Sequence, residues 1–213
     1  MPLLTFLLAK MTQFIDKKTG ASLVTDRTAA ASFFLPDLPE LSHPDYALRL
    51  LQPADSAAWY EYLAMPEVYQ HTSWNLHSAA DLQSVFAHCN QPGEQAQWRF
   101  ALIVKSTGAL AGTIGFHSRN TLNRSAELAY DLHPAHWHRG LASTAAQALL
   151  HWGFGQQKML RIQATVLPEN LPSIAVLQRI GMQYEGRLRH FRLVRGAPRD
   201  YLLYAAIAAD LQV

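Results

Sequence analysis

The order of strand-like and helix-like segments after Tyr46 limits the fold of this chain more than any other feature. Two short strands joined by a glycine-containing hairpin turn are expected at 98–105 and 110–117. The chain then alternates strands with helices, at 125–133, 140–154, 161–167 and 172–180 in turn. Antiparallel strands followed by a strand–helix–strand–helix section predict a mixed α/β sheet flanked by helices.

The segments at either end of this pattern extend the sheet. An opening strand is predicted at 46–51, and Asp55 can cap a helix that carries Trp59, Tyr62 and Leu63 at helical spacing. The other predicted elements are a helix that starts near Ser78 and closing strands at 182–194 and 198–207.

Residues 1–44 differ from this pattern and are predicted to be an N-terminal extension to a domain at 45–213. They contain a hairpin pattern at 14–24 and a stretch with several prolines that ends at Pro44. The extension can add a strand or a contact within a homodimer. The apolar residues 1–9 precede rather than follow a lysine, and they are far fewer than the roughly 20 needed to cross a bilayer, so no export signal is expected.

Charge and cysteine content exclude several classes of protein. A formal charge of +2 and a pI near 8.7 are too mild for a nucleic-acid-binding protein, and no membrane partner is expected. Cys89 is the single cysteine, so no intrachain disulfide can form and a cytoplasmic location is expected. Cys89 itself is interpreted as a buried apolar residue.

A strand followed by a turn and a helix of small residues, 127–142, is the segment most suited to chemistry. Gly140 stands at the entry of the predicted helix, where unpaired backbone N–H groups and the helix dipole favour a pyrophosphate. A glycine before a helix is common, so this feature alone does not identify the ligand.

Ordered motifs across 46–208 resemble the GNAT superfamily of N-acetyltransferases, in particular the type that acetylates ribosomal-protein N-termini. Each motif is loose, but their order and spacing together are specific. They are LRLLQPAD at 48–55, AELAY at 126–130, WHRGLA at 137–142, PENLPS at 168–173, RIGM at 179–182 and DYLLY at 200–204.

The resemblance implies a mostly antiparallel central sheet in which the parallel strands at 125–133 and 161–167 splay apart. The pantetheine arm of acetyl-CoA would lie in that gap, and an amine would attack the thioester with no covalent enzyme intermediate. The acceptor would be a protein N-terminus or a small-molecule amine. A non-catalytic acyl-CoA-binding or interaction module on the same fold is the alternative.

The same resemblance gives Glu127 and Ser173 as candidate catalytic residues. Glu127 would be the general base, directly or through water, because an amine must lose a proton before it attacks a carbonyl; otherwise it belongs to a solvated strand face. Ser173 would hydrogen-bond the sulfur of CoA. Many members of the superfamily carry a tyrosine at the position of Leu177, where it acts as the general acid that protonates the leaving thiolate. This chain has leucine there, so protonation by such a tyrosine is absent.

Candidate acetyl-CoA contacts come from the strand, the loop and the later helix. Asn170 and Ser173 can instead simply cap that helix, Trp137 can pack, and Arg139 can be solvated. His138 replaces a glycine of the family loop, which is tolerable only where φ is not positive. His133, His136 and His138 lack a carboxylate or cysteine at suitable spacing, so no metal is expected. The full set of donor-binding candidates is Leu128, Tyr130, Trp137, His138, Arg139, Gly140, Leu141, Ala142 and Asn170.

Overall fold

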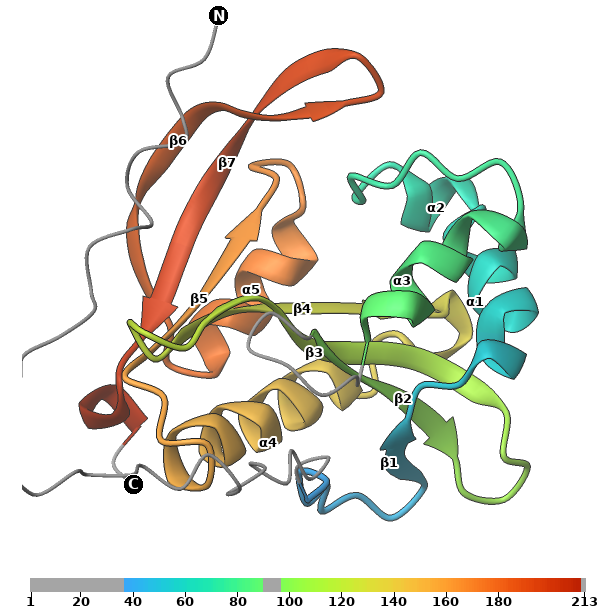
Figure 1. Cartoon of the computed structure of the whole chain (residues 1–213), viewed down its shortest axis with the longest axis horizontal. Coiled ribbons are helices and arrows are strands. Elements are labelled where there is room, and N and C mark those ends of the chain that lie inside the picture. The colour runs from blue at the N-terminus through green and yellow to red at the C-terminus, as the bar shows by residue number, and fades with distance from the viewer. Residues whose placement is uncertain (1–36, 90–96, 212–213) are drawn as a thin grey trace, which may run out of the picture. The chain divides into compact units, whose positions relative to one another are not determined.

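A single mixed sheet organises the part of the chain that the computed structural model describes, residues 37–89 and 97–211. Its strands follow the order β1-β2-β3-β4-β5-β7-β6. Every neighbouring pair is antiparallel except β4 and β5. The predicted mixed, mostly antiparallel sheet is therefore confirmed (Figure 1). The strands are β1 (Tyr46–Leu50), β2 (Trp98–Val104), β3 (Leu110–Asn120), β4 (Ser125–Leu132), β5 (Arg161–Val166), β6 (Gln183–Val194) and β7 (Ala197–Ala206).

Helices cover both faces of the sheet. One face packs against α4 and α5 through a core that includes Phe100, Ile114 and Leu149. The other face packs against α1, α2 and α3, where Trp59 and Tyr62 are fully buried. No helix in the described residues is long and apolar enough to cross a lipid bilayer. The helices are α1 (Ser56–Leu63), α2 (Pro66–Tyr69), α3 (Gln83–His88), α4 (Leu141–Gly155) and α5 (Leu171–Arg179).

Several local predictions need correction. The carboxylate of Asp55 does not cap α1; it pairs with Arg49 and accepts the N–H of Gln52 at 2.8 Å. The short helix α2 was not predicted, because Pro66 suggested only the end of the preceding helix. The predicted hairpin at 14–24 lies outside the described residues, and the boundary at 44 stays a prediction.

The two parallel strands diverge, and this opens the sheet. β4 and β5 pair only where Ser125, Ala126 and Glu127 face 161–163. Beyond Glu127, β4 keeps its partner β3 and β5 keeps its partner β7, but the edges that face each other are no longer paired. Buried backbone N–H and C=O groups need partners. A gap with unpaired strand edges is therefore suited to an extended ligand that carries amide groups.

Candidate functional site

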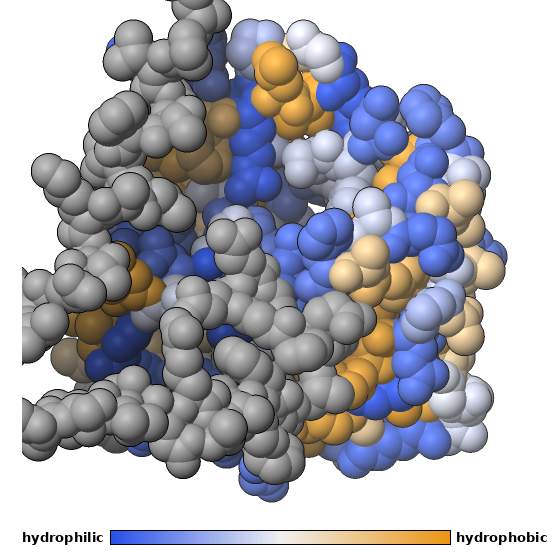
Figure 2. Space-filling view, in the orientation of Figure 1, coloured by the Kyte–Doolittle hydropathy of each residue, from blue (hydrophilic) through white to orange (hydrophobic). Residues whose placement is uncertain are grey.

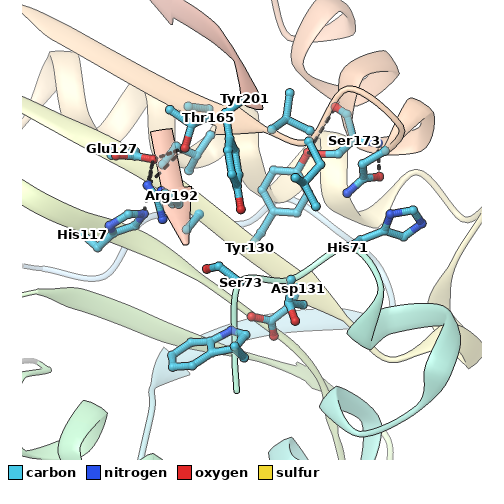
Figure 3. A pocket seen from close by; sticks show the side chains of 18 of the residues that line it. His71, Ser73, His117, Glu127, Tyr130, Asp131, Thr165, Ser173, Arg192 and Tyr201 are labelled. Atoms are coloured by element: carbon cyan, nitrogen blue, oxygen red, sulfur yellow. Dashed lines mark hydrogen bonds and ion pairs between the residues drawn. The ribbon is translucent and has the colours of Figure 1, made fainter. Parts of the chain in front are cut away.

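A pocket of about 290 Å³ lies where β4 and β5 separate (Figure 3). Residues 128–131 and 164–166 form the sides of the pocket, and α5 closes one end. The loop at 71–74 also lines the pocket. The space-filling view shows the molecule hollowed between the β6–β7 hairpin and the side that holds α1–α3 (Figure 2). Of the site residues predicted from sequence, the pocket brings together five: Glu127, Leu128, Tyr130, Asn170 and Ser173.

Glu127 lies at the root of the gap, the point where the pairing of β4 with β5 ends. It is buried, with 5% of its surface exposed. Its Oε1 accepts a hydrogen bond from the Thr165 hydroxyl at 2.5 Å and from Nη2 of Arg192 at 2.8 Å. Nε2 of His117 lies 3.7 Å from the same oxygen. The alternative of a solvated strand face for Glu127 is therefore wrong. The carboxylate is held instead among side chains from β3, β5 and β6.

The imidazole of His117 is the neutral member of this cluster. Burial lowers the pKa of His117 below its ordinary value; the charge of Glu127 opposes that shift, and the guanidinium groups of Arg99 and Arg192 add to it. A histidine with a lowered pKa is unprotonated near neutral pH and can accept a proton.

A second polar pair lies at the α5 end of the pocket. The hydroxyl groups of Tyr130 and Ser173 are 2.8 Å apart, and burial raises the pKa of Tyr130 to about 12, so the phenol keeps its proton. Asn170 caps α5, because its Oδ1 accepts the N–H of Ser173 at 3.2 Å. The hydroxyl of Ser173 has no part in that cap and faces the gap (Figure 3).

The floor of the pocket rests on a buried carboxylate, Asp131. Its oxygens accept hydrogen bonds from the Trp59 indole at 3.0 Å, the Tyr62 hydroxyl at 2.5 Å and the Thr113 hydroxyl at 2.9 Å, and from Arg99. Arg99 and Asp131 are an ion pair with side chains only 9% and 7% exposed. This network ties β4 to β2, β3 and α1 directly below the pocket.

The turn between β6 and β7 contacts the loop that lines the pocket. Nη1 of Arg195 donates to the carbonyl oxygens of Tyr69, Thr72 and Trp74, at 3.2–3.4 Å. Its guanidinium also lies 4.2 Å from the centre of the Tyr69 ring. Arg195 thus fixes the loop at 71–74 relative to the hairpin.

The loop predicted to hold pyrophosphate, 137–142, lies outside the pocket lining. Gly140 has φ of 74°, and the first hydrogen bond of α4 runs from Thr144 N to Gly140 O, so earlier N–H groups have no partner within the helix. The side chain of Leu141 is buried in the core, which leaves only its amide for a ligand.

Two side chains of this loop have specific local roles. His138 adopts φ of 60°, so the condition under which a side chain is tolerated there is not met and the backbone is strained. The indole of Trp137 donates to the carbonyl of Leu132 at 3.0 Å, and its ring packs against the core. In the part of the chain that the structure describes, no group of three or more potential metal ligands occurs.

Sequence reasoning missed His117, Thr165 and Arg192, which belong to three different strands. No motif marks them, and each looks like an ordinary polar residue of a half-buried strand. Only the pairing of β3 with β4 and the approach of β5 and β6 bring them to Glu127. The alternation of Thr113 and His117 on one face of β3 was the single available signal.

Comparison with known proteins finds relatives of this chain. The model of the acetyltransferase (GNAT) domain family matches residues 46–183. The uncharacterized N-acetyltransferase p20 of Bacillus licheniformis is 33% identical over 76% of this chain and 93% of its own length. Spermidine N(1)-acetyltransferase of Escherichia coli is 28% identical over 50% of this chain and 56% of its own length. The structure of Mycobacterium smegmatis RimJ in complex with CoA-disulfide is 27% identical, covers 79% of this chain and 84% of that one, and superposes with a TM-score of 0.67.

Proposed function

The chain belongs to the GNAT acetyltransferase family, and from this premise we propose that it transfers acetyl from acetyl-CoA to the α-amino group of a peptide or protein. The observation that carries the proposal is the gap between β4 and β5, with Glu127 and its partners at the root and Ser173 beside Tyr130 at the α5 end. The candidate catalytic side chains thus border the gap in which we propose that acetyl-CoA binds.

The gap fits the donor in shape and chemistry. The unpaired edge of β4 at Leu128 and Tyr130 would hydrogen-bond the pantetheine amides, and Asn170 borders the same space. The N–H groups at 138–142, at the start of α4, would receive the pyrophosphate, with Arg139 beside them. When bound, acetyl-CoA supplies a thioester that an amine can cleave.

The side chains at the root of the gap would handle the protons. Glu127 and its partners take the proton from the substrate ammonium, which leaves the nitrogen lone pair free to form the C–N bond. As the C–S bond breaks, the proton that the attacking nitrogen still has to lose passes to the departing sulfur, which leaves as the thiol while the Ser173 hydroxyl hydrogen-bonds it. Tyr130, which stays protonated, can donate to Ser173 and so leave the serine proton free for that contact.

Charges in the pocket favour an acceptor with a single ammonium group. The two carboxylates in its lining are Glu127 and Asp131, and each is already paired with an arginine. A polyamine carries several ammonium groups and would meet no unpaired carboxylate among these lining residues. A peptide N-terminus carries one ammonium group, which needs only the contact with Glu127 and its partners at the root of the gap. Spermidine therefore serves as the second candidate acceptor.

Thiol release from acetyl-CoA tests the activity, with alanyl, seryl and methionyl peptides and spermidine as acceptors. We expect release with at least one peptide, and release with spermidine alone would overturn the acceptor assignment. Glu127→Gln should lower turnover roughly 10²–10⁴-fold while acetyl-CoA still binds. Binding without release by any amine would instead favour the non-catalytic module.

Donor binding is tested separately by thermal unfolding. At acetyl-CoA about 100-fold above its dissociation constant, linkage stabilises the fold by about 2.7 kcal/mol. For a domain of this size, that raises the unfolding midpoint by roughly 5–10 °C. The same protein with buffer alone added is the reference. If millimolar acetyl-CoA does not shift the unfolding midpoint, the proposal that acetyl-CoA is the donor is wrong.

The setting of this activity is also a proposal. The donor and the single cysteine favour the cytoplasm. Residues 1–44 are proposed as an extension to the catalytic domain at 45–213, with a homodimer contact as one role. Sedimentation of the full chain and of a chain that starts at residue 37 would test that role.

A further inference from the structure

We infer that His117, rather than Glu127 itself, is the group that first receives the proton of the acceptor amine, and that Glu127 stabilises the resulting imidazolium. The inference rests on the proposed function, because it concerns a proton that only an amine acceptor supplies. It assigns a catalytic role to a residue that no sequence motif marks.

Register places the two side chains together. His117 of β3 is directly opposite Glu127 of β4, so both side chains point to the same face of the sheet and into the pocket (Figure 3). Nε2 of His117 lies 3.7 Å from Oε1 of Glu127, and Nδ1 lies 3.1 Å from the hydroxyl of Ser118. With the proton on Nδ1, Nε2 holds its lone pair at the root of the gap.

The contacts of Glu127 make it a poor first acceptor. Its Oε1 already takes hydrogen bonds from Arg192 and Thr165. A proton on the carboxylate would remove the partner of the Arg192 cation, whose side chain is 29% exposed. Breaking such a pair is costly in a partly buried site. A proton on His117 leaves that ion pair intact.

Charges that face His117 come from three strands. Glu127 on β4 favours the imidazolium, while Arg99 on β2 and Arg192 on β6 oppose it. Burial lowers the pKa of His117 further, so the ring is neutral before the reaction, as a base must be. The proton passes from the ammonium nitrogen to Nε2 and leaves to solvent after the thiol departs.

Substitution of His117 gives the first test, with the peptide that is fastest in the thiol-release panel as acceptor. We expect His117→Gln to lower kcat about 100-fold or more, with the dissociation constant of acetyl-CoA unchanged. Added imidazole should restore part of the activity of His117→Ala. His151→Gln, at an exposed position of α4, is the matched control and should behave as wild type. A His117→Gln enzyme within threefold of wild type would overturn the inference.

The pH dependence distinguishes a base from a merely structural residue. In wild type, kcat/KM should rise with pH and level off above a midpoint below 6.5, the ordinary pKa of histidine. That limb should disappear in His117→Gln. A limb that persists unchanged in the variant would assign the base to another group.

A titration followed by NMR tests the pair without any acceptor. Because Glu127 raises the pKa of His117, Glu127→Gln should move the His117 midpoint to still lower pH. An unmoved midpoint would show that the two groups are not coupled, and would overturn the inference. If wild type releases no thiol with any amine, the proposed function fails; if only the His117 results fail, the proposed function stands.

Discussion

Replacement of Asp131 by alanine tests whether the network below the pocket holds β4 in place. The change removes the acceptor for Arg99, Trp59, Tyr62 and Thr113 at once. Trp59 and Tyr62 are 0% exposed, so water cannot readily replace the lost oxygens. Thr113 also accepts hydrogen bonds from Arg99 and remains in place.

The expected cost follows from these contacts. Breaking a buried ion pair costs about 3–5 kcal/mol, and each buried donor left without an acceptor costs about 1–3 kcal/mol. These terms do not add, because one carboxylate serves all four donors. We therefore expect a loss of about 3–5 kcal/mol, which lowers the unfolding midpoint by roughly 6–20 °C.

Urea unfolding followed by tryptophan fluorescence and circular dichroism measures this loss. Glu185→Ala is the matched control, since it also removes a carboxylate that is paired with an arginine, but from a pair whose side chains are 32% and 40% exposed. That control should cost less than about 1 kcal/mol. Equal midpoints for the two variants would refute the argument that burial of the Asp131 network stabilises β4.

Three further predictions concern the rim of the site and its titration. Gly140→Val should weaken acetyl-CoA binding by about tenfold or more, because φ of Gly140 is 74° and the proposed donor site brings a phosphate to this helix entry. His138→Gly should bind acetyl-CoA as well as wild type or better, and calorimetric titration of the folded proteins measures both affinities. Arg195→Ala should raise the KM of the acceptor but not of acetyl-CoA, with exposed Arg189→Ala as control; equal effects on both constants would contradict the loop contact. Burial lowers the pKa of His71, His117 and His136 in the folded protein below the ordinary histidine value of 6.5. The unfolded chain therefore binds more protons, and the free energy of unfolding should fall as the pH drops below about 6.5. Thermal unfolding as a function of pH measures this, and an unfolding midpoint independent of pH would count against these pKa shifts.

Local sequence determined which segments form the sheet and where the glycine-containing loop before α4 lies. Periodicity of two along 125–133 and a run of small residues after Gly140 are properties of neighbouring residues, so they predicted β4 and α4 within about two residues. Gly140 at the helix entry was likewise predicted from sequence, and the structure gives it the positive φ that glycine permits. Helix α2 escaped because a single turn leaves too little periodicity to detect.

Tertiary structure alone decided what surrounds Glu127. The β3–β4 ladder pairs Asn120 with Ser125. If the ladder continued from this pair without a bulge, Ser118 would lie opposite Glu127, and the imidazole of His117 would point to the other face of the sheet. Ser118 instead adopts φ of 52°, and an irregularity between His117 and Asn120 shifts the register. A bulge of this kind reverses the side-chain direction of all later residues, because the period of a strand is two. The sequence therefore contained the glutamate and its motif, but only the folded sheet paired it with His117, Thr165 and Arg192.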